Sequence, residues 1–226
     1  MRGEIYRPLT IKPAVTVTLH EETAIFTSTT EKKFSLDIIW NSQQKDSVVI
    51  SCLLKSNPAW KSSFRDTILF FQSKNEEKRL TFTVRPTSLQ VADEKLNFTY
   101  NSIQRKEQQS LQSVREINYD HIPKITWFPP LSLALKSADI KTTAKRVLYI
   151  KGAGDNVAAM IRQLGVITDE IDAPKLEELQ LENYDAIITG IRAYNTSPDL
   201  PKYFDKIKSY IAAGGIYLVQ YNSNIS

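Results

Sequence analysis

The sequence predicts a two-domain α+β protein, in which an antiparallel β-sandwich of immunoglobulin-like type precedes an open α/β sheet. Residues 14–100 alternate apolar and polar side chains with period two, which is typical of strands with one face on a core and one in water. After residue 144 the pattern changes to short, continuously apolar runs between amphipathic segments, which is typical of parallel strands covered on both faces. A chain of 226 residues is long enough for two modest domains.

The sandwich is expected over residues 1–119. Alternation is clearest in 15–19 and 80–84, and further strands are predicted at 34–39, 47–54, 67–71 and 95–100. Six or seven short strands at this spacing favour an immunoglobulin-like arrangement. The single cysteine, Cys52, is interpreted as a small buried thiol, and one thiol excludes an intrachain disulfide framework.

Residues 120–143 are interpreted as a linker between the two domains. Three prolines, Trp127 and Phe128 lie within 120–130, and prolines at this density disfavour a regular element. The aromatic side chains predict that the linker is docked on a surface.

The second domain is expected over residues 144–226. Asp155 is predicted to cap a helix over 157–164, because a carboxylate accepts hydrogen bonds from the free N–H groups of a first turn. A second helix is predicted over 200–211, with an apolar stripe of Leu200, Phe204, Ile207 and Ile211. Parallel strands are predicted at 147–150, 166–171, 186–189 and 216–219, with a helical turn at 176–181.

Right-handed crossovers predict the strand order 2-1-3-4, which is that of a flavodoxin-like sheet. Four strands leave such a sheet incomplete. We therefore expect either further strands beyond Ser226 or a homodimer through the open edge of strand 216–219.

The candidate site is the edge where the strands of this sheet end, since open α/β sheets bind ligands there. Arg192 is expected near Asp155. It either forms a salt bridge with that carboxylate or builds, with its neighbours in the loop, a recognition surface for a sugar, a carboxylate or another domain. The candidate binding residues are Lys151, Asp155, Arg192, Tyr194, Asn195, Gln220 and Asn222.

No catalytic set is predicted, and enzymatic activity is left open. Glutamine amidotransferases place a cysteine nucleophile at a strand-to-helix turn, whereas the corresponding turn here is Gln220-Tyr221-Asn222, and no histidine follows His121. The glycines at 152 and 154 form only part of a dinucleotide fingerprint, and Asp155 would repel a phosphate. His20 and His121 lie too far apart in the chain to indicate a zinc site, so no metal or cofactor is expected.

Composition excludes two partner classes. The 29 Lys and Arg residues are interspersed with 25 Asp and Glu rather than clustered, which disfavours nucleic-acid binding. No apolar run approaches the roughly 20 residues of a membrane span, and the polar first residues contain no signal peptide.

Several ordered motifs over Ile117 to Asn222 resemble the C-terminal region of large PIG-L (LmbE-like) deacetylases of Bacteroidetes type. These motifs are INYDHIP, FPP, YIKGAGD, MIRQLG, YDAIITGIRAYNT, AAGG and LVQYN. The family's His-Pro-Asp-Asp signature is absent here. The resemblance implies that zinc-dependent deacetylation of N-acetyl amino sugars belongs to a separate catalytic domain, and that zinc is expected only there.

The resemblance implies a non-catalytic accessory portion: a sandwich plus a glutamine amidotransferase-like domain. It would bind a glycan or the catalytic deacetylase domain, in a protein exported to the periplasm or the cell exterior. Two alternatives remain open. One is a small hydrolase or transferase at the carboxyl edge of the sheet, and the other is a structural dimerisation module.

Overall fold

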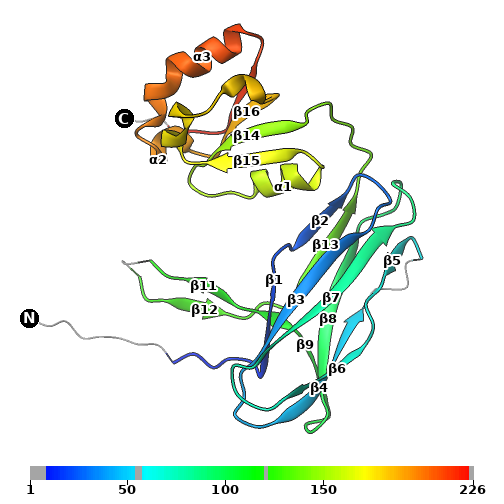
Figure 1. Ribbon diagram of the computed structural model, residues 1–226. Helices are drawn as coiled ribbons and strands as arrows, with labels where there is room; N and C mark the ends of the chain where they lie inside the picture. Colours follow the sequence, from blue (N-terminus) through cyan, green and yellow to red (C-terminus); the bar gives the residue numbers. More distant parts are fainter. Residues whose placement is uncertain (1–8, 54–57, 120–121, 224–226) are drawn as a thin grey trace, which may run out of the picture. The chain divides into compact units, whose positions relative to one another are not determined.

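The computed structural model describes residues 9–53, 58–119 and 122–223, and the chain divides into two compact units, Met1–Asp139 and Ile140–Ser226 (Figure 1). The protein is mostly β, and its first unit is a β-sandwich of immunoglobulin-like type. Among the described helices, none is both long enough and apolar enough to cross a membrane.

Two sheets build the sandwich. One has the order β10-β1-β3-β7-β5. Its strands are β1 (Val15–Leu19), β3 (Lys32–Trp40), β5 (Trp60–Ser62), β7 (Glu77–Pro86) and β10 (Gln112–Ser113). The other has the order β2-β13-β8-β4-β6, with β9 also paired to β8. Its strands are β2 (Thr23–Phe26), β4 (Asp46–Leu53), β6 (Thr67–Phe71), β8 (Glu94–Ser102), β9 (Glu107–Ser110) and β13 (Ser132–Ser137). A separate antiparallel pair consists of β11 (Arg115–Ile117) and β12 (Ile125–Trp127).

Alternation along the strands places one row of side chains inside the sandwich. In β1, Val15 and Val17 are 0% and 2% exposed, and in β4, Val48 and Ile50 are fully buried. Trp40 of β3 stacks on Phe71 of β6, with ring centroids 5.4 Å apart, so an aromatic pair joins the two sheets. The six strands predicted from period two are confirmed, because alternation is itself the signal of a half-buried strand.

The interpretation of residues 120–143 as a linker is wrong for much of its length. β13 lies within it and pairs antiparallel with β8 and parallel with β2. Leu131, Leu133 and Leu135 are each at most 2% exposed and belong to the sandwich core. Their spacing of two residues is a strand signal that the neighbouring prolines obscured.

The second unit contains one four-stranded parallel sheet with the order β15-β14-β16-β17. The strands are β14 (Arg146–Ile150), β15 (Ile167–Ile171), β16 (Ala186–Thr189) and β17 (Ile216–Val219). This is the order predicted from right-handed crossovers. The helices are α1 (Val157–Gln163), α2 (Ala193–Thr196) and α3 (Phe204–Ala212). The predicted turn at 176–181 is formed by two 3₁₀ helices, η1 (Ala173–Glu177) and η2 (Leu181–Asn183), and a third, η3 (Leu200–Tyr203), leads into α3.

The two faces of this sheet are covered unequally. α1 lies on one side of the sheet, and α2 and α3 lie on the other (Figure 1). On the α3 side, Leu148 and Ile187 are fully buried together with Ile207 of the helix. On the α1 side, exposure rises from Tyr149 of β14, at 3%, to Leu218 of β17, at 50%. The seven residues of α1 therefore cover the β14 end of this face and leave the β17 end open to solvent.

The predicted stripe of helix 200–211 is only half buried. Leu200 and Ile207 are fully buried, whereas Phe204 and Ile211 are 54% and 44% exposed. The expectation that all four would face a core is wrong. The physical reason is that, over the described residues, no strand follows β17 in the sheet to cover these two side chains.

Candidate functional site

The loops that follow β14 and β16 meet at the carboxyl edge of the parallel sheet, and two glycines allow them to meet. A Cβ atom on Gly152 would lie 2.1 Å from the carbonyl oxygen of Ile191, and one on Gly190 would lie 2.7 Å from the nitrogen of Gly152. The loops are also joined by a hydrogen bond of 2.8 Å from the Ala153 N–H to the Ile191 carbonyl. These glycines therefore serve close backbone packing.

Asp155 is the centre of a hydrogen-bond network at this edge. Its carboxylate accepts from the Tyr149 hydroxyl, whose oxygen lies 2.5 and 2.6 Å from the two carboxylate oxygens. It also accepts from the N–H groups of Val157 (2.9 Å) and Ile191 (3.0 Å). Gln220 Nε2 donates to the Tyr149 hydroxyl oxygen at 3.0 Å. The carboxylate thus ties together the loops after β14 and β16, and the segment after β17 joins them through the Tyr149 hydroxyl.

The predicted role of Asp155 as a helix cap is realised through the first N–H of α1, at Val157, although the residue at the N-cap position is Asn156. The expected salt bridge between Asp155 and Arg192 is wrong, because the carboxylate is already occupied by Tyr149 and two N–H groups. Sequence reasoning missed Tyr149. The signal was a tyrosine in an otherwise aliphatic buried strand, which requires a partner for its hydroxyl.

Burial and hydrogen bonding act in opposite directions on Asp155. Desolvation raises its pKa, but the hydrogen bonds from Tyr149, Ile191 and Val157 together hold the pKa below the ordinary value of 3.8. For Tyr149, desolvation and the adjacent carboxylate both raise the pKa well above its usual range. The pair is therefore an ionised carboxylate held by a neutral phenol at neutral pH.

We expect Asp155→Asn to lower the thermal unfolding midpoint of the second unit at pH 7, because an amide is a weaker acceptor than a carboxylate. Stability due to the carboxylate is present above its ordinary pKa and is lost as the pH falls through the lowered pKa of the folded state. The difference between the variant and the wild type should therefore shrink below about pH 4. Circular dichroism at 222 nm, recorded at pH 7 and pH 3, measures it.

The matched control is Asp172→Asn. Asp172 is exposed and its oxygens lie 3.4 Å from the Lys151 ammonium, a surface pair that should contribute little at either pH. An Asp155→Asn effect of equal size at both pH values would contradict the electrostatic explanation.

Arg192 lies in the left-handed region, with φ of 57°, and its N–H donates to the carbonyl oxygen of Tyr221 at 2.7 Å. Its guanidinium is exposed and has no partner among the described residues. The Tyr194 N–H donates to the Asn222 side chain at 3.1 Å. The Tyr194 hydroxyl lies 2.7 Å from that of Tyr217.

Asn195 completes the attachment of the segment after β17. Its Nδ2 donates to the Ser223 carbonyl at 3.1 Å, and its Oδ1 accepts from the Ser223 N–H at 3.0 Å. Tyr194 and Asn195 therefore attach the segment after β17 through Asn222 and Ser223. The exposed Lys151 pairs with Asp172 at 3.4 Å, and only Arg192 among the candidate side chains has a charged group without a described partner.

The thiol and imidazole groups of the described chain do not add a nucleophile and base to this edge. Burial raises the pKa of the Cys52 thiol to about 12, so it is an inert thiol of the sandwich. The His20 side chain is 72% exposed and lies 3.5 Å from Asp37, which also pairs with Arg79. His121 lies outside the described residues. Over residues 9–53, 58–119 and 122–223, no group of three or more His, Cys, Asp or Glu could hold a metal ion.

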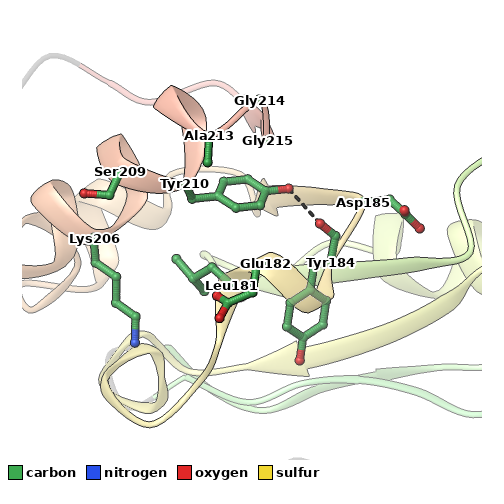
Figure 2. Close-up of a pocket in the computed structure, with 10 residues that line it drawn as sticks. All are labelled: Leu181, Glu182, Tyr184, Asp185, Lys206, Ser209, Tyr210, Ala213, Gly214 and Gly215. Atoms are coloured by element: carbon green, nitrogen blue, oxygen red, sulfur yellow. Dashed lines mark hydrogen bonds between the residues drawn. The ribbon is translucent and has the colours of Figure 1, made fainter.

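A cavity of about 710 Å³ lies at the opposite, amino edge of the same sheet, between η2 and α3 (Figure 2). Its lining includes Tyr184 and Asp185, which precede β16, and Gly214 and Gly215, which precede β17. None of the seven candidate residues lines it. This cavity therefore lies at the amino edge of the sheet, whereas the candidate residues predicted from the sequence lie at its carboxyl edge.

No protein-family model matches this chain, and no curated protein matches it. Solved structures with a similar fold include WR4, an MSP family member of Caenorhabditis elegans, at 10% identity, TM-score 0.33, 54% coverage of this chain and 98% of that chain. They also include PapD-like domain 7 of human CEP192, at 11% identity, TM-score 0.33, and 62% and 98% coverage.

The resemblance to PIG-L deacetylases is wrong. No family model supports it, and the similar structures are MSP, PapD-like and other immunoglobulin-like β-sandwich domains. The glutamine amidotransferase-like assignment of the second unit is wrong for the same reason. Short glycine-marked motifs recur wherever a strand turns into a helix, so their order in one sequence did not identify a family.

Proposed function

We propose that this chain is a non-catalytic binding module that associates with a second copy of itself. The contact is the open β17 edge of its parallel sheet, whose strand order is flavodoxin-like. The observation that carries the proposal is the exposure of β17. Ile216, Leu218 and Val219 are 62%, 50% and 46% exposed, although strands of a parallel α/β sheet are normally covered on both faces.

The two edges of the sheet differ in charge, which favours β17 as the contact. β15, at one edge, carries Asp169 and Glu170, and inward or edge charges of this kind discourage pairing with another chain. β17, at the other edge, reads IYLV and has no charged residue. Its backbone N–H and C=O groups face no further strand among the described residues.

A second copy suits this edge because the strand is complementary to itself. Two β17 strands related by a two-fold axis would pair and bring the three exposed apolar side chains of each copy to the contact. α3 contacts β17, and its exposed Phe204 and Ile211 would add apolar area to the contact. This accounts for the half-buried stripe of that helix.

The enzymatic alternative at the carboxyl edge lacks support. The carboxylate of Asp155 and the amides of Asn195 and Asn222 are engaged in hydrogen bonds within the loops. No described residue there pairs a nucleophile with a base, which acyl-transfer chemistry requires.

The test is the oligomeric state in solution by light scattering and sedimentation. We expect a concentration-dependent dimer whose dissociation constant rises by more than about tenfold in Leu218→Lys, because the two lysines would bring like charges to a paired edge. Leu218 is half-exposed, so the substitution should leave the fold intact.

The control is Ile167→Lys, which places the same charge at an exposed apolar residue of the opposite edge, 62% exposed against 50% for Leu218. It should dimerise as the wild type does. A monomer at all concentrations up to about 1 mM, or equal weakening by both variants, would overturn the proposal.

A further inference from the structure

β6 (Thr67–Phe71) is an open edge of the sandwich in the first unit (Figure 1). It pairs with β4 on one side, and no other strand of the described residues pairs with it. Every second residue of such a strand directs its backbone N–H and C=O groups away from the sheet. β6 reads TILFF and has no charged residue. This edge therefore offers unpaired backbone groups and no charge that would repel a further strand.

The other edges of the sandwich are protected. β5 and β10 have only three and two residues. The Lys32 ammonium donates to the Ile25 carbonyl of β2 at 2.6 Å, so a backbone acceptor of that strand is occupied. β9 carries the charged Glu107. Short strands and charged side chains are common means of preventing edge pairing, and β6 has neither.

Two large apolar side chains of β6 face away from the core. Leu69 and Phe71 are 9% and 0% exposed and belong to the sandwich core. Side chains alternate along a strand, so Ile68 and Phe70 point outward, and they are 65% and 48% exposed. Val49 of β4 lies opposite Ile68 and is only partly buried. The apolar surface therefore begins on β4 and reaches the open edge.

The outer face of the other sheet is polar by comparison. The exposed residues of β7 are Glu77, Arg79, Thr81 and Arg85. Antiparallel sheets that face water on one side normally carry polar side chains on that side. The apolar pair on β6 departs from this pattern within the same sandwich, which indicates a surface that a partner covers.

We propose that β6 pairs antiparallel with β6 of a second copy of this chain, about a two-fold axis at Leu69. This register overlaps all five residues, with Thr67 opposite Phe71 of the partner subunit. Ile68 then lies opposite Phe70 of the partner subunit, and the reverse pair forms as well. An aromatic side chain opposite a β-branched one is a favourable cross-strand pair. A strand satisfies the backbone groups of the edge, which a helix laid over the side chains would not.

The β6 contact belongs to the first unit, whereas β17 belongs to the second, so the two proposals stand or fail independently. The β17 contact also includes side chains of α3. We therefore expect β6 to associate at higher protein concentration than β17. A chain that uses both contacts would form assemblies larger than a dimer.

Disulfide trapping tests the register. Ile68→Cys and Phe70→Cys are prepared separately, mixed in equal amounts and oxidised. Residues directly opposite in an antiparallel pair have Cα atoms about 4.5–5.5 Å apart, which a disulfide spans, whereas diagonal residues lie too far apart. We expect the mixed disulfide dimer, identified by mass spectrometry, to exceed each homodimer by about tenfold. Yields in the proportions of random collision, or an excess of either homodimer, would overturn the proposal.

The native cysteine should not interfere with trapping. Cys52 packs against the sandwich core, and burial raises the pKa of its thiol to about 12. The thiolate, which is the reactive form, is therefore scarce at neutral pH.

Sedimentation of Leu218→Lys measures the β6 contact separately, because that variant weakens the β17 contact and leaves β6 unchanged. We expect a concentration-dependent dimer whose dissociation constant rises by about tenfold or more when Ile68→Lys is added, since a charge then enters the apolar pair. Tryptophan fluorescence checks that the sandwich stays folded. If the β17 contact does not form, Leu218→Lys changes nothing and this measurement is unaffected.

The matched control is Ile125→Lys, added to the same variant. It places an equal charge on an isoleucine of β12 that is 50% exposed and lies outside the two sheets. It should dimerise as Leu218→Lys alone does. A Leu218→Lys protein that stays monomeric up to about 1 mM, or equal weakening by both added lysines, would overturn the β6 proposal without bearing on β17.

Discussion

Gly152→Ala is expected to destabilise the second unit by about 3 kcal/mol or more, a large share of the stability of a unit of this size. The added Cβ would lie 2.1 Å from the Ile191 carbonyl oxygen and 2.8 Å from the carbonyl carbon of Gly190. Both are backbone atoms and cannot rotate away. The loops after β14 and β16 would have to separate, which would break the bond from Ala153 to Ile191.

Urea denaturation followed by two probes measures this effect. All three described α-helices lie in the second unit, so circular dichroism at 222 nm reports mainly on it. All three tryptophans, at positions 40, 60 and 127, lie in the first unit, so their fluorescence is an internal reference. We expect the 222 nm transition to move to lower urea while the fluorescence transition stays in place.

The control for this substitution is Gly154→Ala, two residues further on. Gly154 has a φ of 107° but no atom within 4 Å of its Cβ position, so alanine there would cost only the backbone strain of about 1–2 kcal/mol. Equal destabilisation by the two variants would contradict the explanation by close approach of the loops.

Trp40→Ala is expected to destabilise the sandwich by about 3–5 kcal/mol, because it leaves a cavity between the two sheets. Trp40 is 1% exposed, stacks on Phe71 at 5.4 Å, and donates from Nε1 to the Gln44 carbonyl at 2.9 Å. The fluorescence of Trp60, which is 2% exposed, remains as the reporter.

Trp127→Ala is the matched control for this prediction. It removes the same type of side chain from β12, where Trp127 is 43% exposed, and should cost much less. A similar loss of stability in both variants would show that the contribution of Trp40 does not come from burial between the sheets.

Much of the fold could be predicted because its signals are local. The alternation in β1, β3 and β7 is a pattern of consecutive residues, and so are the apolar runs of β14 and β16. Proline and aromatic residues before β13 masked the alternation of Leu131, Leu133 and Leu135, so one strand of the sandwich was taken for a linker. A local rule fails where two local signals compete.

The candidate site was predicted less well. The seven residues do lie in the loops after β14, β16 and β17, which the strand order brings to one edge. Their bonds could not be foreseen. The Tyr149 hydroxyl donates to the Asp155 carboxylate, for which a salt bridge with Arg192 had been considered. No motif in the sequence indicated the cavity between η2 and α3.

Local periodicity was enough to locate six strands of the sandwich and the four strands of the parallel sheet, and crossover handedness was enough to order those four, because both depend on neighbouring residues and on chirality. The side-chain pairs across loops, the face left open at β17 and the position of the cavity became apparent only from the tertiary packing. Those features arise between residues distant in the chain, and their free energies depend on separations of a few ångströms that no local pattern encodes.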